Sequence, residues 1–190
     1  MEVHPNMNKP RINTRTIALA AVVGAAYAAL TMGFAPISYG PVQFRISEVL
    51  CILPYFLPCT AWGLFIGCAV SNIIGGGILD IVFGSLATLG AALVTAWLGK
   101  KEHTVGNRLL ACLSPVVFNA VIVGAVVTAV FTVEGETINP FTHWGLYAAT
   151  AASVGIGEAV VLYVLGFPLM CWLPTQKFFR DAVAKYGGTL

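Results

Sequence analysis

Long apolar segments restrict this chain to helices that cross a membrane. The segments span positions 16–34, 78–98, 109–131 and 144–167. A helix that rises 1.5 Å per residue needs about 20 apolar residues to cross a bilayer. Because the hydrocarbon core contains no water, backbone groups there must be hydrogen-bonded within the protein, as they are in a helix. We therefore predict an all-α, polytopic membrane protein.

The charged residues are too few for a sizeable soluble domain. They make up 9% of the chain, whereas soluble domains contain about 25%. The net charge of +2 gives no indication of a nucleic-acid partner. The cysteines lie in or beside apolar segments, without CxxC spacing and away from the histidines, so we interpret them as packing residues. No metal site and no cofactor are predicted.

Two shorter apolar segments, 44–58 and 61–76, leave two topologies open: two short spans, or one span and a re-entrant piece. With six spans, every Lys and Arg except Arg45 falls on one side of the membrane, and such residues concentrate on the cytoplasmic side. We therefore predict a cytoplasmic tail (1–15), a six-helix transmembrane domain (16–173) and a second cytoplasmic tail (174–190). The first span is longer than the roughly 7–15 apolar residues of a signal peptide, which favours an uncleaved helix.

The first span carries two neighbouring rows of small residues. Such rows allow helices to approach closely in lipid. They suit either internal packing or docking to another membrane subunit. For a similar row of small residues in 61–76, internal packing is the favoured interpretation. The residues predicted to dock a partner are Ala21, Gly24, Ala25, Ala28 and Ala29.

Glu158 lies near the middle of the last apolar segment. An ionisable side chain there costs about 3 kcal/mol on insertion scales, so we interpret it as part of a functional site. If Trp144 marks the membrane interface, Glu158 lies about 20 Å deeper. Gly155 and Gly157 are expected to leave space for a flat group beside the carboxylate.

Other polar residues in or near the spans also need partners. An Asn within a span must bond another helix or a ligand. An Arg and a Glu at i, i+3 spacing share a helix face, as a local ion pair or as a clamp on a ligand. An Asp at a helix start either caps the helix or binds. An aromatic ring either stacks on a ligand or belongs to the interfacial aromatic belt. With Glu158, the predicted ligand-binding residues are Arg45, Glu48, Asn72, Asp80, Asn119, Tyr39 and Trp144.

This set of polar side chains favours binding over catalysis. The chain has no HExxH, GxSxG or P-loop motif, although a small intramembrane enzyme using Glu158 and Asp80 is the alternative. Carboxylates and amides beside aromatic rings suit a flat heterocycle. A carboxylate can accept two hydrogen bonds from an N–H/NH2 edge such as that of guanine.

The stretches FAPISYGPVQFRISEVLCILPYF and GCAVSNIIGGGILDIVFGSLATL resemble the QueT family. These proteins are S components, the substrate-binding subunits of energy-coupling factor (ECF) transporters, and the likeness covers residues 15–173. The resemblance implies a six-helix bundle that helps to import a queuosine precursor, a 7-deazaguanine base such as queuine, preQ1 or preQ0. An S component for another vitamin or heterocycle is the alternative.

The resemblance also implies partners. These are a transmembrane coupling subunit and two cytoplasmic ATPase subunits, because an S component has no ATPase of its own. The expected location is the cell membrane, with both termini cytoplasmic and no nucleic acid bound.

Overall fold

The computed structural model describes residues 13–39, 43–130, 132–133, 136–137 and 139–190. Four helices are long and apolar enough to cross a membrane: Thr14–Gly33, Asp80–Leu98, Val105–Val130 and Trp144–Thr175. Two further apolar helices, Ile46–Tyr55 and Thr60–Gly75, are shorter. These helices correspond to the six predicted segments. The prediction of an all-α, multi-pass membrane protein is therefore confirmed.

The long helices are divided by local changes in their winding. The first half of the chain forms α1 (Thr14–Gly33), α2 (Ala35–Ser38), η1 (Ile46–Tyr55), α3 (Thr60–Gly75), η2 (Asp80–Gly84) and α4 (Ser85–Leu98). The second half forms α5 (Val105–Phe118), η3 (Asn119–Val123), α6 (Gly124–Val130), β1 (Thr132–Val133), β2 (Glu136–Thr137), α7 (Trp144–Val160), η4 (Val161–Gly166), α8 (Phe167–Trp172), η5 (Leu173–Thr175) and α9 (Lys177–Tyr186). Whereas η1 and η5 are 3₁₀ helices, η2, η3 and η4 are π-helical turns, which often occur at functional sites.

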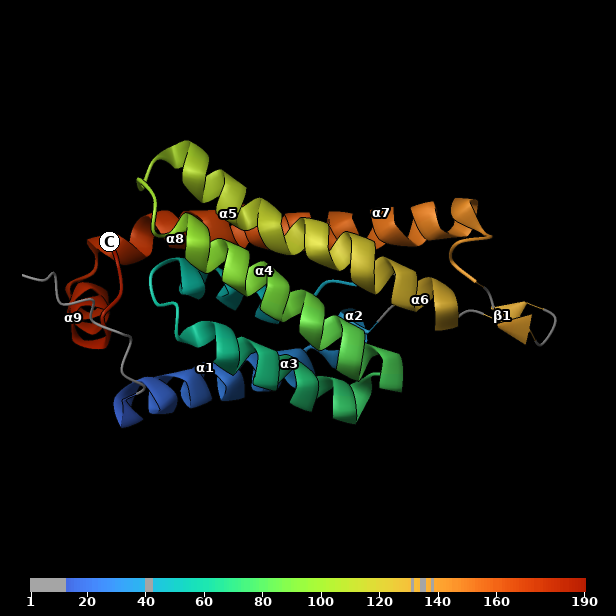
Figure 1. The fold of residues 1–190 in the computed structure, drawn as a ribbon, viewed down its shortest axis with the longest axis horizontal. Helices are drawn as coiled ribbons and strands as arrows, with labels where there is room; N and C mark the ends of the chain where they lie inside the picture. The colour runs from blue at the N-terminus through green and yellow to red at the C-terminus, as the bar shows by residue number, and fades with distance from the viewer. Residues whose placement is uncertain (1–12, 40–42, 131, 134–135, 138) are drawn as a thin grey trace, which may run out of the picture.

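The apolar helices lie side by side along the long axis of the molecule (Figure 1). Helix α1 packs against α3, α3 against α4, α4 against α5, and α6 against α7. The short helix η1 contacts α1, α3, α4 and α5, so it lies inside the bundle. Its side chains Cys51, Ile52 and Tyr55 are fully buried. A helix surrounded by protein in this way does not need the length of a lipid-facing span.

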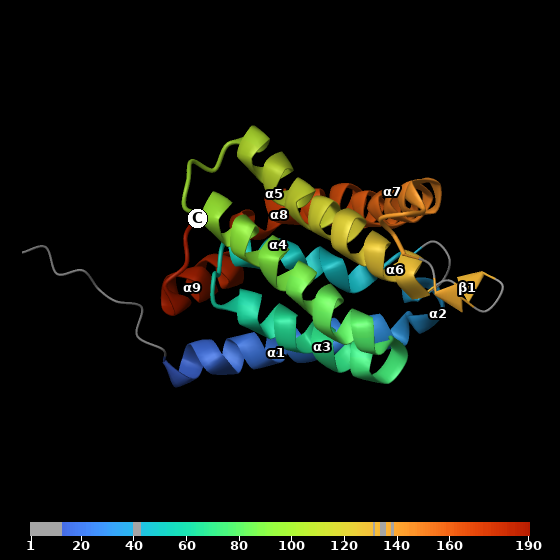
Figure 2. The ribbon, with the colours of Figure 1, turned by 45° about the vertical axis from the view of Figure 1, so that its right-hand side comes forward.

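The two ends of the bundle differ. The β1–β2 hairpin extends beyond α6 at one end, and α9 lies across the other end (Figures 1 and 2). Helix α9 is amphipathic and buries Phe179 and Val183. The C-terminal segment is held by Thr189, whose backbone N–H donates to the Phe56 carbonyl and whose hydroxyl donates to the Gly99 carbonyl, both at 3.0 Å. The predicted C-terminal tail thus contains a helix packed on the bundle.

Glycines bring α1 and α3 into backbone contact. A Cβ at Gly63 would collide with the carbonyl oxygen of Ala20, and one at Gly67 with that of Gly24. The backbones of α1 and α3 can approach this closely only because Gly63 and Gly67 have no side chain. Gly24 is therefore used in internal packing, which is the alternative that the sequence left open. Ala21, Ala25 and Ala29 remain exposed on α1.

Candidate ligand-binding site

A cavity of about 600 Å³ opens at the end of the bundle that carries the β hairpin. Its size lies within the range of small-molecule sites. Most of its wall is apolar, and its polar side chains come from different parts of the chain. The lining residues are Tyr39, Gln43, Gly75, Gly76, Gly77, Asp80, Val127, Val130, Leu146, Ala149, Thr150, Ser153 and Val154.

One wall of the cavity leads to a buried guanidinium. Arg45 is 2% exposed, and its Nη2 lies 4.0 Å from Oδ1 of Asp80. The guanidinium carbon also lies 5.6 Å from the centre of the Tyr39 ring, close enough for a cation–π interaction. The Tyr39 hydroxyl donates to the Ser71 carbonyl at 2.9 Å, which fixes the ring against α3. The loop before η1 and the start of η2 are thereby held together by charge.

Asn72 connects α3 to the same corner. Its Nδ2 donates to the backbone carbonyl of Asp80 at 2.9 Å and lies 3.4 Å from Sγ of Cys68. Gly84 lies beside this amide, where a Cβ would be 3.2 Å from Nδ2. The amide therefore fixes the turn between α3 and η2, and with it the position of the Asp80 carboxylate.

Glu48 lies deeper, on η1, and is fully buried. The Tyr27 hydroxyl from α1 donates to its Oε1, and the Cys51 thiol donates to its Oε2 at 2.9 Å. Buried carboxylates require such donors, because losing water without replacement is costly. The sequence-based analysis missed Tyr27 and Cys51. A tyrosine in the middle of an alanine-rich membrane helix was the available signal, since its hydroxyl needs a partner.

Glu158 is 2% exposed and bonds to the neighbouring span. The Nδ2 of Asn119 donates to its Oε1 at 3.0 Å. Asn119 begins the π turn η3, and η4 begins three residues after Glu158. Glu158 lies near enough to Glu48 and Arg45 for their charges to interact. The structure therefore brings these residues, which are distant in sequence, into one electrostatic group.

The loop that lines the cavity also lies against the helix of Glu158. A Cβ at Gly157 would collide with the carbonyl oxygen of Gln43. The space beside the carboxylate that Gly157 was expected to provide is thus filled by backbone, so that expectation was wrong for Gly157. A Cβ at Gly155 would lie 3.2 Å from Cβ of Ala120, so this glycine also serves helix packing.

Several buried polar atoms in this region have no hydrogen-bond partner within the described part of the chain. A protein normally satisfies its buried polar groups, so a cluster of unpaired atoms of this kind requires an explanation. Both donors and acceptors are present. The atoms are Oε1 of Gln43, Nε and Nη2 of Arg45, Oδ1 of Asn72, Oδ1 of Asp80, Oδ1 of Asn119 and Oε2 of Glu158.

This geometry bears on two of the sequence-based alternatives. The carboxylate within ion-pair distance of Arg45 belongs to Asp80 and not to Glu48. Trp144 is 62% exposed, and its ring packs edge-on against Tyr147 at a centroid distance of 5.9 Å. The structure does not bring Trp144 into the buried group. Among the described residues, no cluster of three or more His, Cys, Asp or Glu side chains could hold a metal ion.

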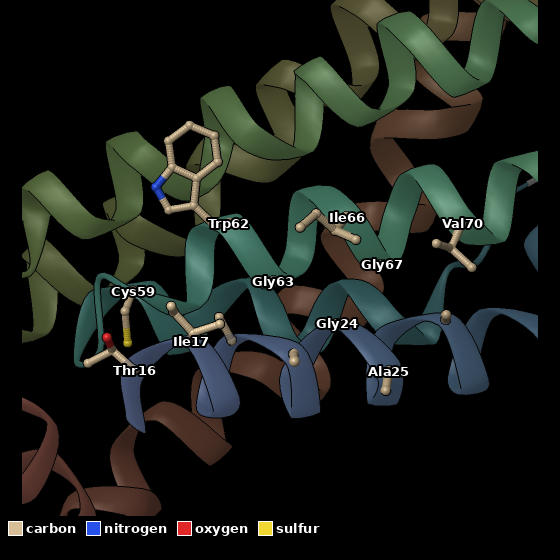
Figure 3. Close-up of a pocket in the computed structure, with 13 residues that line it drawn as sticks. Thr16, Ile17, Gly24, Ala25, Cys59, Trp62, Gly63, Ile66, Gly67 and Val70 are labelled. Carbon is tan, nitrogen blue, oxygen red and sulfur yellow. The ribbon is translucent and has the colours of Figure 1, made fainter. Parts of the chain in front are cut away.

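A second hollow of about 690 Å³ lies on the outside of the bundle, between α1 and α3. Figure 3 shows Gly24 facing Gly63 and Gly67 along this groove. Its walls are almost entirely apolar. The lining residues are Thr16, Ile17, Ala20, Ala21, Gly24, Ala25, Ala28, Cys59, Trp62, Gly63, Ile66, Gly67 and Val70. Four of the five residues predicted for docking are among them.

Comparison with known proteins points to one family. The family model described as QueT transporter matches residues 17–175. The Queuosine precursor transporter QueT of Lactococcus lactis subsp. cremoris (strain MG1363) is 41% identical over 78 residues, covering 40% of this chain and 46% of that protein. The aligned part of the chain thus spans about half the length of that relative. No solved structure matches the chain.

Proposed function

The chain belongs to the QueT transporter family, and from this we propose that it is the substrate-binding membrane subunit of an ECF-type importer. Its substrate in this proposal is a 7-deazaguanine base, a queuosine precursor. The name of the partly aligned relative supports that substrate class. The observation that carries the proposal is the set of buried polar atoms without a hydrogen-bond partner, two of which belong to Gln43 and Asp80 in the wall of the cavity of about 600 Å³.

The unpaired atoms suit the hydrogen-bonding edge of such a base. Oε2 of Glu158 and Oδ1 of Asn119 are acceptors, and they can receive the ring N–H and the exocyclic NH2 of a guanine-like edge. The unpaired N–H groups of Arg45 can donate to the carbonyl oxygen of the base. Tyr39 presents an aromatic ring at the cavity wall, against which a flat base can stack.

The distribution of basic residues supports an orientation with the cavity outside the cell. Lys100, Lys101 and Arg108 lie in or beside the loop between α4 and α5, and α9 carries further basic residues. This end of the bundle is opposite the β hairpin (Figure 1). Because basic residues concentrate on the cytoplasmic side, both termini are cytoplasmic in this proposal.

The groove between α1 and α3 is the proposed docking surface for the transmembrane coupling subunit. Ala21, Ala25 and Ala29 are exposed there or beside it, and small side chains let a partner helix approach closely. ATP hydrolysis belongs to the two ATPase subunits of the proposed complex. The role of this chain is to bind the base outside and present it to the coupling subunit.

The ligand site is tested by comparing two carboxylates. Glu158→Gln keeps the size of the side chain but removes a buried charge, and Glu102→Gln does the same at an exposed loop position. A hydrogen bond to a charged group is worth about 1.5–3 kcal/mol, which corresponds to an affinity loss of about 10- to 150-fold. Binding of 7-deazaguanine bases to purified protein is measured by calorimetry. Equal affinities for the two variants would contradict the site assignment.

A further inference from the structure

Basic side chains from two segments gather at the end of the bundle opposite the β hairpin (Figures 1 and 2). One segment is the loop between α4 and α5 with the start of α5, and the other is α9. Together they contain six basic residues and two acidic ones, Glu102 and Asp181. The positive charge at this end therefore exceeds the negative charge. The basic residues are Lys100, Lys101, Arg108, Lys177, Arg180 and Lys185.

Direct contacts hold the two segments together. The His103 ring of the loop stacks on the Phe56 ring at a centroid distance of 6.3 Å, and Phe56 meets Phe179 of α9 edge-on at 5.3 Å. The hydroxyl of Thr189, which follows α9, donates to the carbonyl of Gly99 at 3.0 Å. The loop and α9 are therefore adjacent parts of one surface.

Two buried nitrogen atoms in the loop segment lack a hydrogen-bond partner within the described part of the chain. They are Nε of Arg108 and Nδ1 of His103. Burial and the nearby charge of Arg108 lower the pKa of His103, so this ring is neutral at neutral pH and Arg108 supplies the positive charge. A guanidinium N–H without a partner suits a phosphate oxygen, to which arginine donates strong, charge-assisted hydrogen bonds.

Exposed aromatic rings place this surface at the level of lipid headgroups. Trp97 near the end of α4 is 55% exposed, and Trp172 at the end of α8 is 52% exposed. Tryptophans at the ends of spans are typical of the membrane interface. Nζ of Lys101 lies 3.6 Å from the centre of the Trp97 ring, so a cation is held beside that position. On α9, Phe178 is exposed and shares a face with Lys185 two turns later, as in helices that anchor at an interface.

We propose that this surface binds the phosphate headgroups of anionic phospholipids, with Arg108 and Lys101 on one side and Lys185 of α9 on the other. Clusters of four to eight basic residues next to a membrane span are typical of anionic-lipid sites. Lipid is the favoured occupant because the exposed tryptophans lie where headgroups surround a membrane-spanning bundle. This inference goes beyond the proposed function and does not depend on which molecule the cavity binds.

The experiment compares two lipids that differ only in their headgroup. The purified full chain is reconstituted in phosphatidylcholine vesicles with spin-labelled phosphatidylglycerol or spin-labelled phosphatidylcholine of the same acyl chains. Electron spin resonance gives the fraction of label immobilised by the protein, and from it the ratio of the two association constants. We expect phosphatidylglycerol to be favoured at least about 5-fold at low salt, the contribution of one basic side chain at an anionic surface. A ratio of one would overturn the inference.

A second arm separates lipid from free phosphate. Chloride is replaced by inorganic phosphate at equal ionic strength, so that screening by salt stays the same. We expect the ratio of the association constants to stay unchanged. A ratio that falls to one would show that the surface takes free phosphate instead of lipid, and this result would also overturn the inference.

Variants separate a specific site from a general attraction to basic residues. Arg108→Gln and Lys185→Gln each remove one positive charge from the surface, and Arg15→Gln removes the same charge from an exposed position on α1. We expect the ratio to fall by about half or more in the first two variants and to persist in Arg15→Gln. An equal fall in all three, or no fall in the folded Arg108 and Lys185 variants, would contradict the site. The comparison of the two lipids on the unmodified chain holds even if a variant fails to fold.

Discussion

The bond between Tyr27 and Glu48 provides a sharp test of the buried polar group. Tyr27 is fully buried in α1, and its hydroxyl donates to Oε1 of Glu48 on η1. Tyr27→Phe removes this one oxygen and keeps the ring, so the packing of the ring is retained. The substitution therefore isolates the hydrogen bond that joins the first helix to the centre of the bundle.

The expected loss of stability follows from the charge of the acceptor. A hydrogen bond to a charged group contributes about 1.5–3 kcal/mol, whereas one between neutral groups contributes about 0.5–1.5 kcal/mol. For a chain of this size, 1 kcal/mol shifts the melting temperature by roughly 2–4 °C. Tyr27→Phe should accordingly lower the melting temperature by roughly 3–12 °C. Tyr147→Phe is the matched control, since that hydroxyl donates to a neutral carbonyl of Val121 at 3.2 Å.

The melting temperatures of Tyr27→Phe and Tyr147→Phe are measured by thermal unfolding of the purified proteins in the same detergent as the unmodified protein. A double-mutant cycle with Glu48→Gln then isolates the interaction free energy between the two side chains, which lies between about 0.5 and 3 kcal/mol for residues in contact. A loss for Tyr27→Phe no larger than that for Tyr147→Phe would refute the reasoning. Additive effects of Tyr27→Phe and Glu48→Gln would refute it as well, because they would show no coupling between the two side chains.

Three further predictions concern docking, packing and binding. Ala25→Trp fills the groove between α1 and α3 and should abolish co-purification with the coupling subunit. Ala18→Trp is the control, because Ala18 is exposed on α1 outside the groove and its substitution should leave co-purification intact. Equal amounts of coupling subunit recovered with the two variants would contradict the docking surface. Gly63→Leu collides with the Ala20 carbonyl and should cost about 1–3 kcal/mol in unfolding measurements, and an unchanged melting temperature would contradict the close contact. Asn119→Ala removes the amide beside Glu158 and should weaken base binding about 10-fold in calorimetry, a loss of about 1.4 kcal/mol; unchanged affinity would exclude the amide from the site.

The helices could be predicted from the sequence because a membrane leaves so few alternatives. The first span was predicted at 16–34 and is observed as Thr14–Gly33, and the fourth was predicted at 78–98 and is observed as Asp80–Leu98. Apolar length alone determines such segments. The position of the short helix η1 could be predicted, but its 3₁₀ winding could not, because that winding depends on the helices that surround it.

The pairing of polar residues was harder to predict than the helices. The i, i+3 spacing of Arg45 and Glu48 left open a local ion pair or a clamp on a ligand, and in the structure each has a partner on another element. Sequence spacing describes neighbours on one helix, whereas these partners depend on how separate helices pack. Asn119 and Glu158 were both recognised as buried groups in need of partners, and the structure joins them to each other.

The small residues of α1 illustrate the same limit. Alternating rows of alanine and glycine indicated a smooth helix surface, but not which row faces α3 and which faces outward. The structure assigns Gly24 to the internal contact and leaves Ala21 and Ala25 exposed. This division follows from the rotation of α1 about its axis, which the helix's own sequence does not determine.

The identity of the bound molecule tests the central claim most directly. The protein is purified in mild detergent from cells that make queuosine precursors, and the ligand released on denaturation is identified by mass spectrometry. The account predicts a 7-deazaguanine base that is retained by the unmodified protein and by Glu102→Gln but lost from Glu158→Gln. Release of an unrelated vitamin from the unmodified protein, or equal retention of the base by both variants, would contradict it.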